Sequence, residues 1–231
     1  MVPQTEPHRT DRRTVQIWCG GRELTGDLTV PVGASGLVIF AHGSGSSRFS
    51  VRNRAVAAEF HRRGLGTLLF DLLTRDEELW DQATRHLRFD IPLLADRLVV
   101  TTDWVAREFA ASPLDVGYFG ASTGAAAALV AAAERPKVVR AVVSRGGRPD
   151  LAGDALPRVE APTLLIVGGN DDVVLDLNRQ AFEAMRAPKR LEVVEGATHL
   201  FEEPGALEDV ARLAGDWFAR HLTGVARPVA R

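Results

Sequence analysis

The stretch DVGYFGASTGAAAAL, residues 115–129, decides the fold expected of this chain. Its first part, 116–119, has the apolar and aromatic character of a buried β-strand, and its alanine-rich end is typical of a helix. Between them, residues 120–124 match G-x-S-x-G, in which a serine occupies a sharp strand-to-helix turn and small neighbours let the backbone close up. The motif predicts that Ser122 is a nucleophile. The alternative is a tight turn in which this serine only caps the helix.

Apolar runs and longer amphipathic stretches alternate on both sides of this segment. Continuous apolar runs, typical of strands buried on both faces, lie at 36–43, 66–73, 115–122, 138–144, 162–169 and 190–196. The spacing of apolar residues predicts helices at about 51–63, 90–111, 123–134, 175–187 and 206–222. Two short runs, 14–19 and 23–31, predict an antiparallel hairpin around two glycines. This alternation predicts an α/β fold whose mostly parallel sheet has helices on both faces.

Composition places the chain among ordinary folded proteins. Of its 231 residues, 45% are hydrophobic and 25% charged, which excludes a disordered or collagen-like protein. We expect one α/β domain over 14–222, with flexible tails at 1–13 and 223–231. The net charge of −2 provides no global attraction to nucleic acid or to an anionic membrane. No run approaches the roughly 18 apolar residues of a membrane helix, and the start lacks a secretory signal, so we expect a cytoplasmic protein.

The cysteine and histidine content indicates neither a disulfide nor a metal site. Cys19 is the only cysteine, so no intramolecular disulfide can form, and we expect it to be a small buried residue. The six histidines show no ligand spacing such as H-E-x-x-H. No metal or other cofactor is therefore expected.

A base and an acid for the serine follow two later strands. Ligands of parallel sheets bind beyond the carboxyl ends of the strands, and a serine hydroxyl needs a base that a carboxylate orients. After Ser122 only two histidines remain: His199, on a loop after the last strand, and His221, near the end of the last helix. Asp171 is the first carboxylate after the turn that ends the preceding strand, and we expect Asp172 to be a solvated neighbour or a helix cap. The sequence predicts Ser122, Asp171 and His199 as a catalytic triad.

The loop HGSG, residues 42–45, follows the first long buried strand. Acyl transfer places negative charge on the carbonyl oxygen, which backbone N–H groups stabilise. We expect one donor from Thr123, the residue after the nucleophile, and the other from Ser44, with the glycine after it as an alternative. A phosphate-binding loop is excluded because Arg48 stands where G-x-G-x-x-G needs its third glycine. We expect His42 to brace the loop.

These motifs resemble those of the α/β-hydrolase superfamily, in particular its dienelactone-hydrolase-like branch. The supporting strings are HGSGSSR (42–48), FDLLT (70–74), GYFGASTGAAAAL (117–129), SRGGRPDLAG (144–153), PTLLIVGGNDD (162–172) and GATHLFEEPG (196–205). The resemblance implies an eight-stranded sheet with Ser122, Asp171 and His199 as the triad. Dienelactone hydrolase proper has a cysteine nucleophile, so the serine here favours ordinary serine esterase chemistry. Relatives of this kind are also found fused or adjacent to phosphoribosyltransferase modules, and these 231 residues contain no such module.

Three features bear on the substrate. Only about 17 residues separate Ser144 from Pro162, too few for a large cap domain. A charged insertion at 74–90, with Trp80 as its aromatic anchor, either walls one side of the pocket or is a solvated excursion. Arg145 follows a strand on the same edge, where we expect it to hold an anionic substrate group. Its alternative is structural, either pairing with Asp150 or bracing the glycine turn beside it.

The sequence thus predicts a serine hydrolase that cleaves carboxylic esters or lactones of small molecules through an acyl-enzyme on Ser122. Alternatives are a thioesterase, acyltransferase or peptidase with the same triad, or a non-catalytic ligand-binding protein that kept the hydrolase fold. The expected partner is the small-molecule substrate, with no nucleic acid and no membrane. A homodimer is left open.

Overall fold

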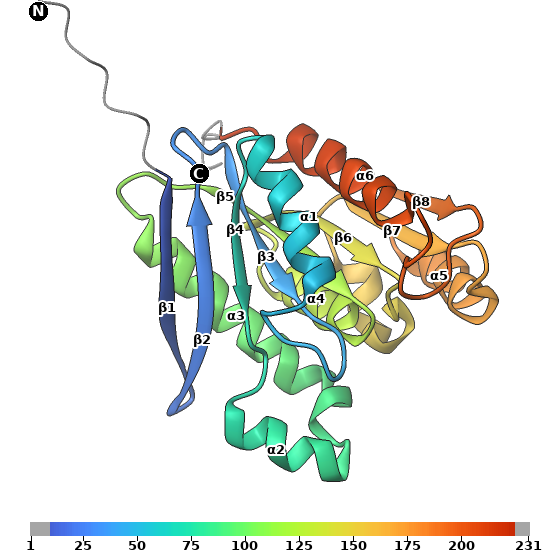
Figure 1. Ribbon diagram of the computed structural model, residues 1–231, viewed down its shortest axis with the longest axis horizontal. Helices are drawn as coiled ribbons and strands as arrows, with labels where there is room; N and C mark the ends of the chain where they lie inside the picture. The colour runs from blue at the N-terminus through green and yellow to red at the C-terminus, as the bar shows by residue number, and fades with distance from the viewer. Residues whose placement is uncertain (1–9, 225–231) are drawn as a thin grey trace, which may run out of the picture.

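An eight-stranded sheet in the order β1-β2-β4-β3-β5-β6-β7-β8 forms the centre of the protein (Figure 1). The computed structural model describes residues 10–224. The strands are β1 (Asp11–Cys19), β2 (Arg22–Val30), β3 (Gly36–Ala41), β4 (Gly66–Phe70), β5 (Asp115–Ala121), β6 (Val139–Arg145), β7 (Thr163–Gly168) and β8 (Lys189–Val194). The α-helices are α1 (Val51–Arg62), α2 (Arg75–Thr84), α3 (Ile91–Glu108), α4 (Thr123–Glu134), α5 (Asp172–Ala184) and α6 (Ala206–His221), and the 3-10 helices are η1 (Leu87–Phe89) and η2 (Pro149–Arg158).

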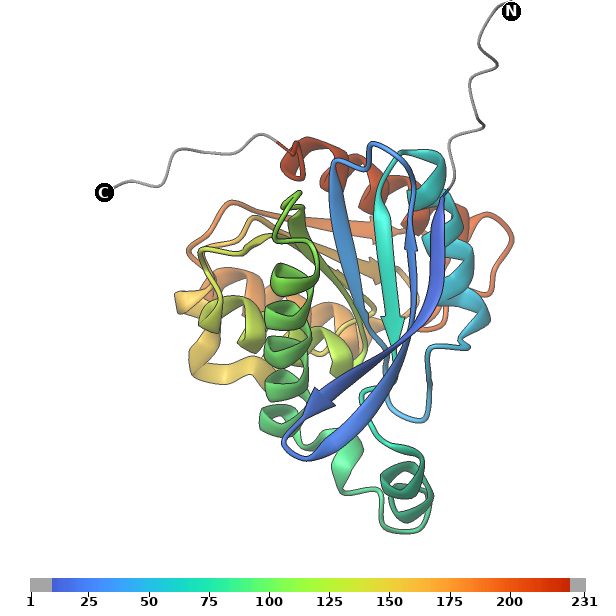
Figure 2. The same ribbon diagram turned by 90° about the vertical axis from the view of Figure 1, so that its left-hand side faces the viewer.

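The predicted mostly parallel sheet with an N-terminal hairpin is confirmed. Strand β1 pairs antiparallel with β2 and β2 with β4, whereas β4, β3, β5, β6, β7 and β8 are parallel to one another. Figure 2 shows the long, twisted hairpin at the edge of the sheet. Strand β1 begins at Asp11, so the folded part extends into the segment predicted as a tail. The rest of that tail, residues 1–9, and residues 225–231 of the C-terminal tail lie outside the described residues.

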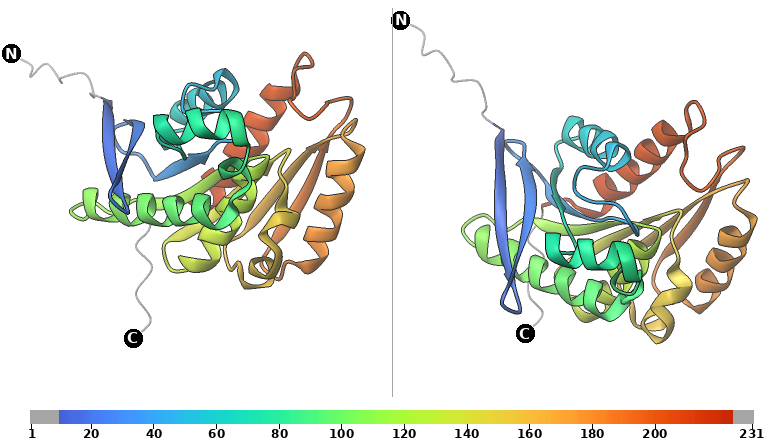
Figure 3. Two further views of the ribbon diagram at one scale, coloured as in Figure 1. Left: turned by 90° about the horizontal axis from the view of Figure 1, so that it is seen from below. Right: turned by 60° about the horizontal axis from the view of Figure 1, so that its bottom comes forward.

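Helices cover both faces of the sheet. Helices α1 and α6 lie on one face, and α3, α4, η2 and α5 lie on the other (Figure 3). Because side chains alternate along a strand, Phe119 of β5 faces α1 and α6, where its ring lies 5.9 Å from that of Phe60, centroid to centroid. Its neighbour Tyr118 faces the other side and shares a hydrogen bond of 2.5 Å with Thr102 of α3. The apolar residues of β5 are thus buried on both faces.

The insertion at 74–90 is folded rather than irregular. Thr74 accepts a hydrogen bond from the backbone of Glu77, whose carboxylate accepts one from the backbone of Thr74, and this capping box starts α2. The T-x-x-E signature was present in the sequence and predicts this start. Helix α2 lies beyond the carboxyl end of β4 (Figure 1). The aromatic ring of Trp80 is not a buried anchor, since this residue is half exposed and lies beside His86.

No large cap covers the carboxyl edge of the sheet in the described part of the chain. The connection between β6 and β7 contains only η2. Between residues 10 and 224, no helix has the length and apolar character needed to cross a bilayer.

Candidate active site

Ser122 stands on a strained turn between β5 and α4. Its φ of 50° and ψ of −124° are unfavourable for a residue with a side chain, and such strain is concentrated at functional sites. Both flanking glycines are required. A Cβ at Gly120 would lie 2.4 Å from Cα of Ala125, and one at Gly124 would lie 2.3 Å from the carbonyl oxygen of Ala41. The G-x-S-x-G spacing therefore reflects close contact of the turn with α4 and with β3.

Asp171 and His199 form a hydrogen-bonded pair at the same edge. Nδ1 of His199 lies 2.7 Å from Oδ2 of Asp171, with 39% of the histidine side chain and 15% of the aspartate side chain exposed. Asp171 ends the turn after β7, and His199 lies in the loop between β8 and α6. The other predicted carboxylate, Asp172, is exposed at the first position of α5. A carboxylate on Nδ1 leaves Nε2 of the ring free to accept a proton.

The end of β6 connects this pair to the serine. The backbone N–H of Ser122 donates to the carbonyl oxygen of Arg145 over 3.4 Å. The next residue, Gly146, lies against the loop that carries His199. A Cβ added to Gly146 would lie 3.6 Å from Nδ1 of that histidine. Among the described residues, the Ser122 hydroxyl makes no hydrogen bond to another side chain. Bonds between nucleophile and base are often loose when no substrate is bound.

Ser44 and Thr123 lie side by side next to the serine. Their hydroxyl oxygens are 3.0 Å apart, and a Cβ at Gly43 would lie 3.1 Å from Cβ of Ser122. Thr123 is the first residue of α4, so its N–H has no partner within the helix. Within residues 10–224, the backbone N–H groups of Ser44 and Thr123 donate to no protein acceptor. Both are therefore free to bind an oxyanion.

His42 braces the loop that carries Ser44. Its Nδ1 lies 3.0 Å from the carbonyl oxygen of Gly43, and its Nε2 accepts from the N–H of Leu72 over 3.0 Å. These contacts require a neutral ring with the proton on Nδ1. Burial lowers the pKa of His42, which also favours the neutral form. The predicted brace is present, with Leu72 as its anchor.

Arg48, in the loop that follows His42, is largely buried, with 19% of its side chain exposed. Its guanidinium pairs with Asp71, whose carboxylate also accepts the Arg48 backbone N–H over 2.8 Å. Asp71 directly follows β4, so this contact fastens the loop to the neighbouring strand.

Arg145 lies at the carboxyl end of β6 on the face covered by α1 and α6. It is 8% exposed, and its guanidinium carbon lies 5.8 Å from the ring centroid of Phe201. Its Nε and one Nη are buried without a hydrogen-bond partner. Burial, and then the positive charge of Arg52, lowers the pKa of Arg145 to about 10, so it is charged at neutral pH. It does not pair with Asp150, which binds Arg148 instead.

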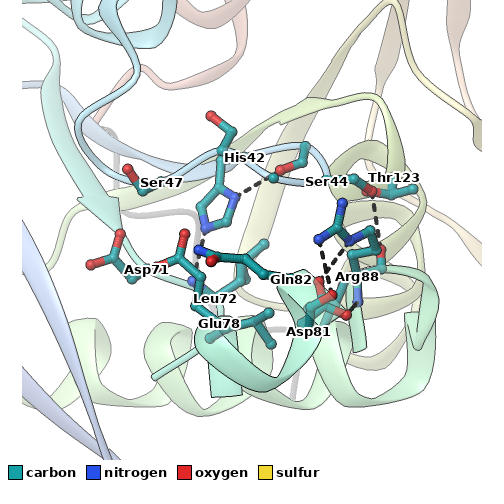
Figure 4. Close-up of a pocket in the computed structure, with 15 residues that line it drawn as sticks. His42, Ser44, Ser47, Asp71, Leu72, Glu78, Asp81, Gln82, Arg88 and Thr123 are labelled. Carbon is teal, nitrogen blue, oxygen red and sulfur yellow. Dashed lines mark hydrogen bonds and ion pairs between the residues drawn. The ribbon is translucent and has the colours of Figure 1, made fainter. Parts of the chain in front are cut away.

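A small pocket of about 90 Å³, partly open to solvent, adjoins the proposed oxyanion donors. Its inner wall comes from the loop around His42 and Ser44, and its outer wall from α2 and η1 (Figure 4). The insertion thus walls the pocket, one of the two alternatives left open by the sequence. Sequence reasoning missed the residues that α2 and η1 contribute, which are Glu78, Asp81, Gln82 and Arg88. The capping box could have revealed this helix in the sequence. In a helix, residues three and four positions apart lie on one face, as Glu78, Asp81 and Gln82 do.

No group of three or more His, Cys, Asp or Glu side chains in the described part of the chain is arranged to hold a metal ion.

Known proteins resemble this chain in sequence and in fold. The model of the Dienelactone hydrolase family matches residues 26–222. The chain belongs to that family. A crystal structure of Dienelactone hydrolase from Anabaena variabilis is 58% identical, with a TM-score of 0.90, and the match covers 93% of this chain and 99% of that one. Est1E from Butyrivibrio proteoclasticus shares the fold at 17% identity, with a TM-score of 0.74 over 90% of this chain and 98% of that one.

One relative is about twice as long as the chain described here. The chain is 60% identical over 210 residues to the "Putative phosphoribosyl transferase" of Mycobacterium tuberculosis strain H37Rv. The match covers 91% of this chain and 46% of that protein, so the chain spans about half the length of this relative.

Proposed function

We propose that this member of the dienelactone hydrolase family is a serine hydrolase that cleaves carboxylic esters or lactones of small molecules through an acyl-enzyme on Ser122. The observation that carries the proposal is the 2.7 Å bond between His199 and Asp171 beside the strained turn of Ser122. Free backbone donors at Ser44 and Thr123 support it, because acyl transfer needs a site for the developing oxyanion.

In the proposed mechanism, Oγ of Ser122 attacks the carbonyl carbon while Nε2 of His199 takes its proton. Asp171 holds Nδ1–H and stabilises the imidazolium that forms. The negative oxygen of the tetrahedral intermediate binds the N–H groups of Ser44 and Thr123. When the intermediate collapses, His199 protonates the leaving alcohol. The imidazole then activates water, whose attack releases the carboxylic acid and returns the proton to the serine.

Arg145 remains a proposed contact for an anionic group of the substrate. The support is its buried guanidinium, which carries two N–H-bearing nitrogens without a protein partner. Arg145 lies outside the pocket beneath α2, so this group would belong to another part of the substrate.

A fluorophosphonate probe and a small chromogenic ester test the proposal. We expect the probe to label Ser122, and the ester to show a burst of alcohol when deacylation is slower than acylation. Ser122→Ala should lose labelling and most turnover, a fall of roughly 10³-fold or more. Ser46→Ala is a matched control, since Ser46 is a nearby pocket-lining serine outside the proposed triad and oxyanion hole.

Undiminished ester turnover in Ser122→Ala would contradict the acyl-enzyme. Products made with competing amines, thiols and alcohols distinguish the ester and lactone activity from that of an acyltransferase, thioesterase or peptidase. A wild-type chain that binds esters but neither reacts with the probe nor cleaves them would be a ligand-binding protein instead.

A further inference from the structure

The pocket beneath α2 has an unbalanced negative charge. Four ionised side chains line it: the carboxylates of Asp71, Glu78 and Asp81 and the guanidinium of Arg88. His42, on the opposite wall, is held neutral by its two backbone contacts. The charge of the pocket therefore depends on which of the three carboxylates have a cationic partner.

Two of these carboxylates are neutralised by arginines. Asp71 pairs with Arg48. Asp81 pairs with Arg88, whose Nε lies 2.6 Å from Oδ2 and whose backbone N–H also donates to the same carboxylate. In each pair the positive charge of the arginine offsets the negative charge of the aspartate.

Glu78 has no such partner. No ion pair or side-chain hydrogen bond of Glu78 is found within residues 10–224. It is half-buried in the α2 wall, across the pocket from His42 (Figure 4). One uncompensated carboxylate thus faces a site that also contains apolar side chains of Leu72, Leu73 and Leu94. A cation here would gain Coulomb energy that a neutral group of equal size would not.

Contacts on the other side of α2 hold Glu78 in place. The residue before it, Glu77, forms a buried ion pair of 2.6 Å with Arg97 of α3. The same guanidinium donates to the carbonyl oxygen of Leu72, directly after β4. At the end of the wall, the Ser44 hydroxyl donates to the carbonyl oxygen of Arg88 over 3.3 Å. The part of the α2 backbone that carries Glu78 is therefore held against the loop of the proposed oxyanion donors.

We propose that Glu78 is a specificity-determining residue, which makes the pocket beside Ser122 prefer an ester whose group on this side carries a positive charge, such as a quaternary ammonium. The inference rests on the proposed function, because hydrolysis at Ser122 would place the positively charged group of the ester next to the reacting carbonyl. It names the substrate class that the hydrolase chemistry leaves open.

Two isosteric esters test the proposal. Acetylcholine and 3,3-dimethylbutyl acetate have nearly the same shape and differ by one positive charge, and a pH-stat measures hydrolysis of both. We expect wild-type kcat/KM to be about 3- to 10-fold higher for the cation, as one partly solvated charge pair allows. In Glu78→Gln this ratio should fall to about 1. Asp76→Asn makes the same charge change on an exposed residue of α2 outside the pocket, and should keep the wild-type ratio.

An equal wild-type preference for both esters, or a ratio that Glu78→Gln and Asp76→Asn change alike, would overturn the proposal. Labelling of Ser122 by fluorophosphonate, measured on the same preparations, separates this failure from a failure of the hydrolase function. Direct binding provides a readout independent of turnover. Tetramethylammonium should shift the NMR signals of the His42 ring in the wild type and in Asp76→Asn, but not in Glu78→Gln, and no shift in the wild type would contradict the proposed cation site.

Discussion

The backbone N–H of Leu72 donates to Nε2 of His42 over 3.0 Å, and this bond joins the end of β4 to the loop that carries Ser44. The bond exists only while Nε2 is unprotonated. Protonation of the ring therefore breaks the connection that positions a proposed oxyanion donor.

Stability should consequently fall in acid through His42. Burial lowers its pKa in the folded state, so below the ordinary value of about 6.5 the unfolded chain binds a proton that the folded chain does not. The free energy of unfolding should decrease by up to about 1.4 kcal/mol per pH unit from pH 6.5 down to the folded-state pKa. Urea denaturation of the wild type and of His42→Asn at pH 7.5 and 5.5 measures this loss.

The variant should be less stable at pH 7.5 and should lose less stability on acidification. Burial also lowers the pKa of His61 and His221, so some loss persists in His42→Asn. An acid-induced loss equal to that of the wild type would show that His42 does not titrate in this way.

Asp171→Asn should keep the fold and lose most of the activity. An amide can still contact Nδ1, but it no longer stabilises the imidazolium and it favours the wrong tautomer of His199. We expect kcat for a small ester to fall about 10³- to 10⁴-fold, with little change in KM. Asp172→Asn, which changes an exposed carboxylate at the next position, should remain within about 2-fold of the wild type. Comparable losses in the two variants would contradict the assignment of the acid.

Gly124→Ala should destabilise the protein more than its helix propensity suggests. Alanine favours a helix over glycine by about 1 kcal/mol, yet here the new Cβ would lie 2.3 Å from the carbonyl oxygen of Ala41. We expect a net loss of about 2 kcal/mol or more, because α4 must move away from β3. Urea denaturation compares this variant with Ala133→Gly, whose expected loss is only about 1 kcal/mol. A stabilised Gly124→Ala would show that the turn tolerates the shift.

Arg145→Met separates a substrate contact from a structural role. Methionine fills a similar volume without a charge, and removing a buried guanidinium with unpartnered nitrogens should not greatly reduce stability. We expect kcat/KM to fall about 10-fold or more for an ester with an anionic acyl group, and to change little for its neutral counterpart. Parallel assays of both esters measure the difference. Equal losses for the two would assign Arg145 to the framework of the site.

Local patterns in the sequence were sufficient for the main elements of the fold. Apolar runs and helical spacing predicted the hairpin, the parallel strands and the helices α1, α3, α4, α5 and α6. The G-x-S-x-G motif predicted the turn at Ser122. These features are visible because secondary structure and tight turns depend on residues that are neighbours along the chain. The same logic placed Asp171 and His199 after strands that end at one edge of the sheet.

Only the tertiary structure decided how these segments meet. Nothing in the sequence pairs His42 with Leu72 or Glu77 with Arg97, since each contact joins side chains and strand ends that are distant in the chain. The charge facing the pocket is decided in the same way. Glu78 and Asp81 are equivalent as sequence letters, but folding places Arg88 against one carboxylate and leaves the other free, because ion pairing depends on positions in space rather than on composition.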